Sequence, residues 1–99
     1  MPTRKRQKTI PISMDDVRLI MGREFANLHI YLESTFCVRC SDQANTLLNP
    51  TAKVNDLEDI LFDGVCSNCG GRVGRYVETG ENKEMAARAR DLRARLMKM

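Results

Sequence analysis

The sequence predicts a small α+β protein, and three observations lead to that prediction. Two cysteine pairs with C-x-x-C spacing stand 25 residues apart, an arrangement by which two tight turns can bring four thiolates together. Stretches of alternating apolar residues, which are typical of strands, flank these pairs. Stretches with helical spacing precede, separate and follow them. We therefore expect a small antiparallel β unit with an N-terminal helix, a short helix between the cysteine pairs and a long C-terminal helix.

Length and composition favour one metal-stabilised domain. The chain has 99 residues, of which 42% are apolar and 5% are aromatic, with no tryptophan. A core this thin gains stability from a cross-link such as a bound metal ion. We expect residues 1–10 to form a flexible basic arm, residues 11–80 the metal-binding domain, and residues 81–99 a C-terminal amphipathic helix.

The first helix is predicted from its capping residues. Ser13 is a good N-cap, and Asp15 and Asp16 stand in the first turn, where carboxylates face the positive end of the helix dipole. A helix over residues 13–23 is expected. Adjacent residues on a helix diverge by about 100°, so the two aspartates are interpreted as capping residues and not as a catalytic pair.

The stretch that follows has the alternation of a strand. Leu28, Ile30 and Leu32 alternate with more polar residues, which predicts a strand with one buried face that leads into Cys37. His29, the only histidine, falls on the opposite face. Because four cysteines already complete a structural coordination shell, His29 is expected to be a partly exposed strand residue and not a metal ligand.

A second helix is expected between the cysteine pairs. Residues 41–55 contain several turn formers and predict a short return strand and a loop. Asn55 then precedes a stretch in which Glu58 takes the third helical position, as a capping box requires. A helix over residues 55–63 is therefore expected, and Gly64 would end it.

The second cysteine pair carries the most specific local signal. Cys69 is followed by Gly70 and Gly71, and glycine there permits the left-handed conformation in which amide N–H groups point back at a thiolate. The residues that follow alternate again, with Val73 and Val77 apolar, and predict a strand. If both turns meet on one ion, the strand that enters the first turn and the strand that leaves the second run antiparallel and can pair.

The motif consists of four cysteines and two turn glycines, namely Cys37, Cys40, Cys66, Cys69, Gly70 and Gly71. With the strand that follows, it resembles a zinc ribbon or a related four-cysteine zinc finger. Ligand type and spacing favour one zinc ion per chain, bound by the four cysteines, and iron in a rubredoxin-like site is the weaker alternative. Two disulfides or a thioredoxin-like redox pair are not favoured, because the sequence shows neither a signal for an oxidising compartment nor the strand–helix motif around a single pair.

The last residues predict a helix with a narrow apolar seam. The seam residues recur at steps of four and three and are Met85, Ala89, Leu92, Leu96 and Met99. Such a seam is typical of packing against a single partner helix. That partner is either the N-terminal helix of the same chain or another protein, including a second copy of this chain.

The net charge of +3 is unevenly distributed. Residues 1–8 carry +4, residues 81–99 carry +3 and residues 9–80 carry −4. The basic ends are therefore candidates for phosphate contacts, whereas the acidic centre is expected to be a poor phosphate-binding surface. The candidate phosphate contacts are Arg4, Lys5, Arg6, Lys8, Arg88, Arg90, Arg93 and Arg95.

These features predict a non-catalytic zinc-binding protein whose ion is structural, because a shell of four thiolates leaves no position for water or substrate. The first functional hypothesis is a protein-interaction or assembly module that uses the C-terminal helix. The alternative is a nucleic-acid-binding accessory or regulatory protein that contacts phosphates through its basic ends. No stretch is long and apolar enough to span a bilayer, and free thiols suit a reducing compartment, so we expect a cytoplasmic location without membrane contact.

Overall fold

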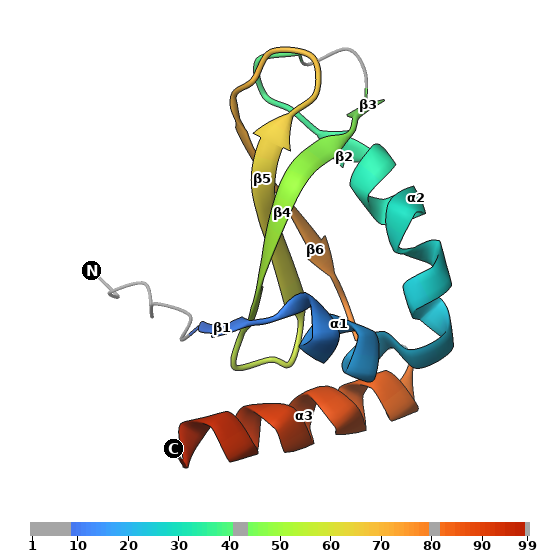
Figure 1. Cartoon of the computed structure of the whole chain (residues 1–99), viewed down its shortest axis with the longest axis vertical. Coiled ribbons are helices and arrows are strands. Elements are labelled where there is room, and N and C mark those ends of the chain that lie inside the picture. The colour runs from blue at the N-terminus through green and yellow to red at the C-terminus, as the bar shows by residue number, and fades with distance from the viewer. Residues whose placement is uncertain (1–8, 41–43, 80–81, 99) are drawn as a thin grey trace, which may run out of the picture.

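A computed structural model describes residues 9–40, 44–79 and 82–98, and these residues form a mixed α+β structure, as the sequence predicts (Figure 1). It contains a four-stranded antiparallel sheet with the order β1-β4-β5-β6 and a two-stranded sheet of β2 and β3. None of the described helices has the length and apolar character that crossing a bilayer requires. The elements in chain order are β1 (Ile10–Ile12), α1 (Met14–Met21), the 3-10 helix η1 (Gly22–Asn27), α2 (Leu28–Glu33), β2 (Thr35–Phe36), β3 (Ala44–Asn45), β4 (Leu47–Val54), β5 (Ile60–Cys66), β6 (Arg72–Val77) and α3 (Lys83–Met97).

The start of α1 is where the sequence predicts it. The hydroxyl of Ser13 accepts a hydrogen bond from the backbone N–H of Asp16 at 3.0 Å, and the Asp16 carboxylate accepts one from the N–H of Ser13 at 3.0 Å. This reciprocal pair is a capping box, which satisfies N–H groups that the start of a helix leaves without intrahelical partners. Gly22, with a φ of +55°, ends the helix. The expected capping role of Asp16 is therefore confirmed.

The strand predicted after residue 25 is wrong for most of its length. The chain continues as helix through η1 and α2, and only the two residues of β2 are extended. Within α2, Leu28 is buried and Leu32 packs against the core four residues later, whereas Ile30 is 54% exposed. Three alternating apolar residues fit a helix as well as a strand over so short a distance, and here packing selects the helix.

The helix predicted over residues 55–63 is also wrong. The first part of this stretch forms the hairpin turn between β4 and β5, in which Asn55 Oδ1 accepts hydrogen bonds from the N–H groups of Leu57 and Asp59, both at 2.9 Å. Glu58 has a φ of +64°, in the left-handed region that a right-handed helix does not contain. Asn55 therefore caps a turn instead of a helix, and the residues that follow the turn form β5.

The strand that enters the first cysteine turn does not pair with the strand that leaves the second, which corrects a further prediction. β2 pairs with β3, while β6 pairs with β5 and places Val65 opposite Arg72. β5 and β6 are joined by the second cysteine turn itself, which is closed by a hydrogen bond from the Cys66 N–H to the Gly71 carbonyl at 2.8 Å. Closing this short loop costs less chain entropy than joining two distant strands.

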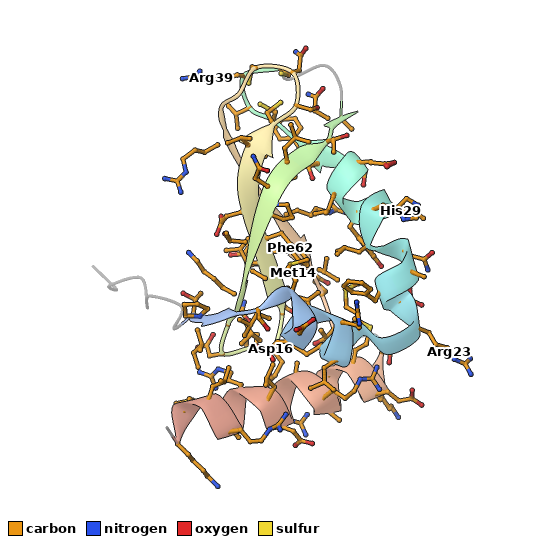
Figure 2. All side chains as sticks on the ribbon, viewed as in Figure 1. Met14, Asp16, Arg23, His29, Arg39 and Phe62 are labelled. Atoms are coloured by element: carbon orange, nitrogen blue, oxygen red, sulfur yellow. The ribbon has the colours of Figure 1, made fainter. Side chains whose placement is uncertain are left out.

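The core lies between the large sheet and the helices. Phe62 of β5 is fully buried (Figure 2), as are Val17 and Ile20 of α1. α3 crosses the end of the molecule opposite the cysteine turns and packs against α1 (Figure 1). Of the two partners expected for the C-terminal helix, the structure therefore shows the N-terminal helix of the same chain.

Candidate metal centre

The two turns that carry the four cysteines lie at one end of the molecule (Figure 1), and there the cysteines form one cluster. The first turn follows β2, and the second joins β5 to β6. The four Sγ atoms all lie within 4.8 Å of one another, so the cluster could hold a single metal ion. The described residues of this region, 34–40, 44–50 and 64–73, are called the cysteine end below.

The spacing of the sulfur atoms fits a tetrahedral ion. The Sγ atoms of Cys37 and Cys69 are 3.6 Å apart, and those of Cys40 and Cys66 are 3.8 Å apart. Four sulfur atoms bound tetrahedrally at about 2.3 Å from a zinc ion lie about 3.8 Å from one another. A disulfide needs a separation of about 2.05 Å, and all four cysteines are free. The structure thus brings together the four ligands that the sequence predicts.

The second turn shows why glycine follows its last cysteine. Gly70 has a φ of +74°, in the left-handed region that strains any residue with a Cβ atom. Its N–H donates to the Cys66 carbonyl at 2.9 Å, and the N–H of Gly71 donates to the Sγ of Cys69 at 3.4 Å. A Cβ atom on Gly70 would meet nothing within 4 Å. The backbone conformation, and not a lack of space, therefore requires glycine.

A side chain that the sequence analysis did not single out joins the two turns. Asn68 Nδ2 donates a hydrogen bond to the Sγ of Cys40, 3.3 Å away on the other turn. The neighbouring Ser67 forms two hydrogen bonds with Thr46, the residue before β4. Its N–H donates to the Thr46 carbonyl at 2.9 Å, and its Oγ accepts from the Thr46 N–H at 3.1 Å. Donors of this kind orient ligand sulfur atoms and offset part of their charge. The only signal in the sequence was an amide side chain between the cysteines of the second pair.

The thiols of the cluster differ in acidity. A backbone hydrogen bond from Cys69 lowers the pKa of Cys66 from 9.0 to about 7, and the backbone of Asn68 contributes in the same direction. The side chain of Asn68 lowers the pKa of Cys40, but desolvation and hydrogen bonds with the other three thiols outweigh it and raise that pKa to about 11. Because a sulfur ligand must be deprotonated to bind a metal, metal binding would require Cys40 to lose its proton, whereas the lowered pKa of Cys66 favours its thiolate.

His29 is not part of the cluster. It is exposed on α2, a helix and not the strand that the sequence predicts, and its side chain points away from the molecule (Figure 2). Among the described residues, the group that could hold an ion contains the four cysteines without a histidine. Its placement agrees with the expectation that it is not a ligand.

The predicted phosphate contacts lie away from the cysteine end. The four on the N-terminal arm fall outside the described residues and are Arg4, Lys5, Arg6 and Lys8. Those on α3 lie at the other end of the molecule (Figure 1). There, Arg90 is 3.8 Å from the Glu58 carboxylate, Arg93 is partly buried and Arg95 is exposed. The structure therefore does not gather these residues around the metal ligands.

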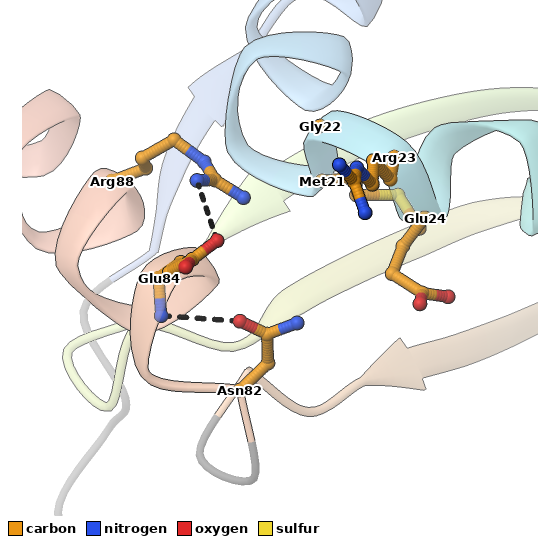
Figure 3. Close-up of a pocket in the computed structure, with 7 residues that line it drawn as sticks. All are labelled: Met21, Gly22, Arg23, Glu24, Asn82, Glu84 and Arg88. Atoms are coloured by element: carbon orange, nitrogen blue, oxygen red, sulfur yellow. Dashed lines mark hydrogen bonds and ion pairs between the residues drawn. The ribbon is translucent and has the colours of Figure 1, made fainter.

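Arg88, the remaining predicted phosphate contact, is used inside the protein. Its Nε donates to the Ile20 carbonyl at 2.8 Å, and its guanidinium lies 3.9 Å from the Glu84 carboxylate (Figure 3). The pocket around it is lined by Met21, Gly22, Arg23, Glu24, Asn82, Glu84 and Arg88. Two bases and two acids give this pocket no single sign of charge, which makes it a poor site for phosphate.

The apolar seam of α3 packs within the chain. Met85, Ala89 and Leu92 are buried, and Leu96 is partly buried against the same core cluster that contains α1 residues. Met99 lies outside the described residues. The described part of the seam therefore contributes to the core of this protein.

Comparisons of this chain with protein-family models, with curated proteins and with solved structures find no match.

Proposed function

We propose that this is a small non-catalytic protein built around one structural zinc ion. The observation that carries the proposal is the sulfur spacing of 3.6 and 3.8 Å, which matches the roughly 3.8 Å between thiolates on a tetrahedral zinc ion. Four thiolates fill the coordination shell and leave no position for water or substrate. The role of the ion is then to stabilise and not to react.

A metal ion would add stability to the cysteine end because the strands beside the first turn are short. β2 and β3 contribute two residues each, and a two-stranded pair of this size is not stable by itself in water. Structural zinc contributes about 10–16 kcal/mol in peptide models. The ion would therefore anchor the first turn to the second, which the larger sheet already supports.

Elemental analysis of protein purified under reducing conditions tests this proposal. We expect one zinc per chain, together with loss of the metal and of folded structure at the cysteine end in Cys66→Ser. Val38→Ser is the matched control, because Val38 stands inside the first cysteine turn, is 82% exposed and is not a ligand. Protein that contains no metal contradicts the proposal, and iron with visible thiolate absorption contradicts the choice of zinc.

The role that fits a structural ion is binding to another macromolecule, as an interaction or assembly module. The described seam of α3 is packed in the core, so a protein partner or a second copy would contact the exposed side of α3 or another exposed surface. Apolar side chains are exposed at both ends of the large hairpin, with Leu48 at 43% and Leu57 at 65%. A mass by light scattering that rises with concentration supports self-association, and a constant monomer mass contradicts it.

Nucleic-acid binding is the second candidate function. It is favoured by the exposed basic side chains of α3, which include Arg90, Arg95 and Lys98. Binding through phosphates weakens steeply with salt, whereas apolar association does not. A fluorescence titration with DNA and RNA at low and moderate salt separates the two candidates, and the absence of binding at low salt contradicts this one.

A further inference from the structure

The cysteine end exposes two large apolar side chains beside a metal ligand. Phe36 is 62% exposed and Val38 is 82% exposed, while Cys37 between them is 2% exposed. In β2 the side chain of Thr35 is buried and that of Phe36 is exposed, as alternation along a strand requires, and Cys37 and Val38 in the turn that follows continue this order. The core therefore uses little of the Phe36 ring, and the ring is available to stack on a partner.

Two guanidinium groups lie at the same end. Arg39 points away from the molecule (Figure 2), and a methyl group added at Gly71 would lie 3.4 Å from its Cδ atom. Arg39 thus lies against Gly71 of the second turn, and Gly71 is followed in the chain by Arg72 at the start of β6. In the described part of the chain, neither arginine has an ion pair or a hydrogen bond through its side chain.

The described residues of the cysteine end include neither aspartate nor glutamate; Asp42 lies outside the described residues. Asp63, one residue beyond the cysteine end on β5, lies 3.4 Å from the Lys53 ammonium and is thus paired with another base. Three further acids of the central segment lie farther away. Asp56, Glu58 and Asp59 stand in the turn at the opposite end of β5. The sequence predicts that the whole metal-binding domain is a poor phosphate-binding surface, and the cysteine end departs from that prediction because this acidic turn lies at the other end of the β4–β5 hairpin.

Hydrogen bonds to the sulfur atoms reduce the negative charge that a bound zinc–thiolate cluster would place beside the two arginines. Four thiolates and one Zn²⁺ carry a formal charge of −2, but the N–H of Gly71 and the amide of Asn68 donate to the sulfur atoms of Cys69 and Cys40. Such donors take up part of the sulfur charge. The two arginines are exposed and carry their charge outward.

We propose that the cysteine end binds single-stranded nucleic acid, with one base stacked on Phe36 and neighbouring phosphates held by Arg39 and Arg72. Aromatic stacking and guanidinium–phosphate contacts are the interactions by which proteins hold single strands without reading their sequence. Bases in a duplex stay stacked and out of reach of a single ring, so a single strand is the occupant. The proposal rests on the proposed function in one respect, since the zinc ion fixes the turns that carry these side chains.

Fluorescence anisotropy with a labelled oligouridylate and the full-length, zinc-loaded protein at low salt measures this binding. Phe36→Ala removes the stacking surface, and the affinity should fall about 5- to 150-fold. Phe36→Trp keeps a stacking ring and should retain the affinity. Leu57→Ala is the matched control, because Leu57 is 65% exposed at the far end of β5, and it should leave the affinity unchanged.

The salt dependence tests the two arginines. Each phosphate contact to a single strand contributes about −0.7 to the slope of log affinity against log salt concentration. Two contacts predict a slope of about −1.4, and Arg39→Ala or Arg72→Ala should each reduce its magnitude by about 0.7. Arg23→Ala, at an exposed arginine of η1, is the matched control and should leave the slope as it is, whereas Arg95→Ala tests the alternative contact through α3.

Several results would overturn this assignment. One is that zinc-containing protein does not bind the oligonucleotide at low salt; another is that Phe36→Ala and Leu57→Ala lose the same affinity. A third is that the slope of log affinity against log salt changes with Arg95→Ala and not with the Arg39 or Arg72 variants. A fourth is that the protein binds a duplex as tightly as a single strand. Self-association that Phe36→Ala abolishes would assign the surface to a second copy instead. Zinc content measured on the same sample separates this proposal from the proposed function. Metal-free protein contradicts the structural zinc ion, whereas zinc-loaded protein that does not bind the oligonucleotide contradicts only the nucleic-acid surface.

Discussion

The Nε atom of Arg88 donates a hydrogen bond to the backbone carbonyl of Ile20 at 2.8 Å and so ties α3 to the last turn of α1. Carbonyls in the last turn of a helix lack intrahelical partners, and a guanidinium there also meets the negative end of the helix dipole. Gly22 makes room for this contact, because a Cβ atom on it would lie 3.0 Å from Arg88 Nη2. One side chain thus completes a helix end that lies 68 residues earlier in the chain.

Replacing Arg88 with alanine should lower the free energy of unfolding by about 1.5–3 kcal/mol, because a charge-assisted hydrogen bond is lost and a carbonyl loses its partner. Arg95→Ala is the matched control on the exposed side of α3 and should change this free energy by less than about 0.5 kcal/mol. Urea unfolding of the zinc-loaded protein, followed by circular dichroism, gives both values. Equal effects of the two substitutions would show that the bond to Ile20 contributes nothing.

Gly70→Ala should destabilise the second cysteine turn by about 1–2 kcal/mol, because alanine is strained in the left-handed region. Gly74→Ala is the control, since a Cβ atom there would have its nearest neighbours at 3.6 Å, an ordinary contact. Competition with a chromophoric chelator should show weaker metal binding in the first variant and unchanged binding in the second. Tight metal binding by Gly70→Ala would mean that the turn tolerates another backbone conformation.

Asn68→Ala should weaken metal binding about 10-fold or more, because its amide donates to the Sγ of Cys40 and such hydrogen bonds hold ligands in orientation. Asn27→Ala provides the comparison, since the amide of the exposed Asn27 donates to the Glu24 carboxylate on η1 instead. Both affinities come from chelator competition at one pH. If the two variants bind equally well, the contact with Cys40 has no part in holding the ion.

The affinity for the metal should depend on pH through the ionisation of the Cys66 thiol. Its pKa is lowered to about 7, so above that pH the thiolate already exists, and below it one more proton must leave when the metal binds. The slope of log affinity against pH should therefore increase by about one as the pH falls through about 7. Calorimetry in buffers of different ionisation enthalpy counts the released protons. A proton count that stays constant from about pH 6 to about pH 8 would contradict this expectation.

Features that depend on a few neighbouring residues could be predicted from the sequence. The capping box of Ser13 and Asp16 forms as its spacing indicates. Gly70 takes the left-handed conformation that the cysteine turn requires. The long apolar spacing of α3 also predicts its helix correctly. In each case the interactions that select the conformation lie within one or two turns of the chain, so the local pattern suffices.

Short apolar stretches could not be assigned in this way. The residues around Leu28 fit either a strand or a helix, and burial against the core selects the helix. Asn55 can cap a helix or a turn, and the turn is selected because it lets β5 pair with β4 and β6 on both sides. Asn68 was missed because its partner, the Sγ of Cys40, comes from the other turn.

The sequence by itself determines the four candidate metal ligands and the glycines of the second cysteine turn. A turn of this kind is a local structure, so its ligand types and turn residues can be recognised from neighbouring positions. The tertiary structure decides what surrounds them. It packs the described seam of α3 into the core, and it separates the acids of the β4–β5 turn from the exposed Phe36 and Arg39. These outcomes depend on which strands pair and which faces are buried, and such choices are made by contacts between residues far apart in the chain.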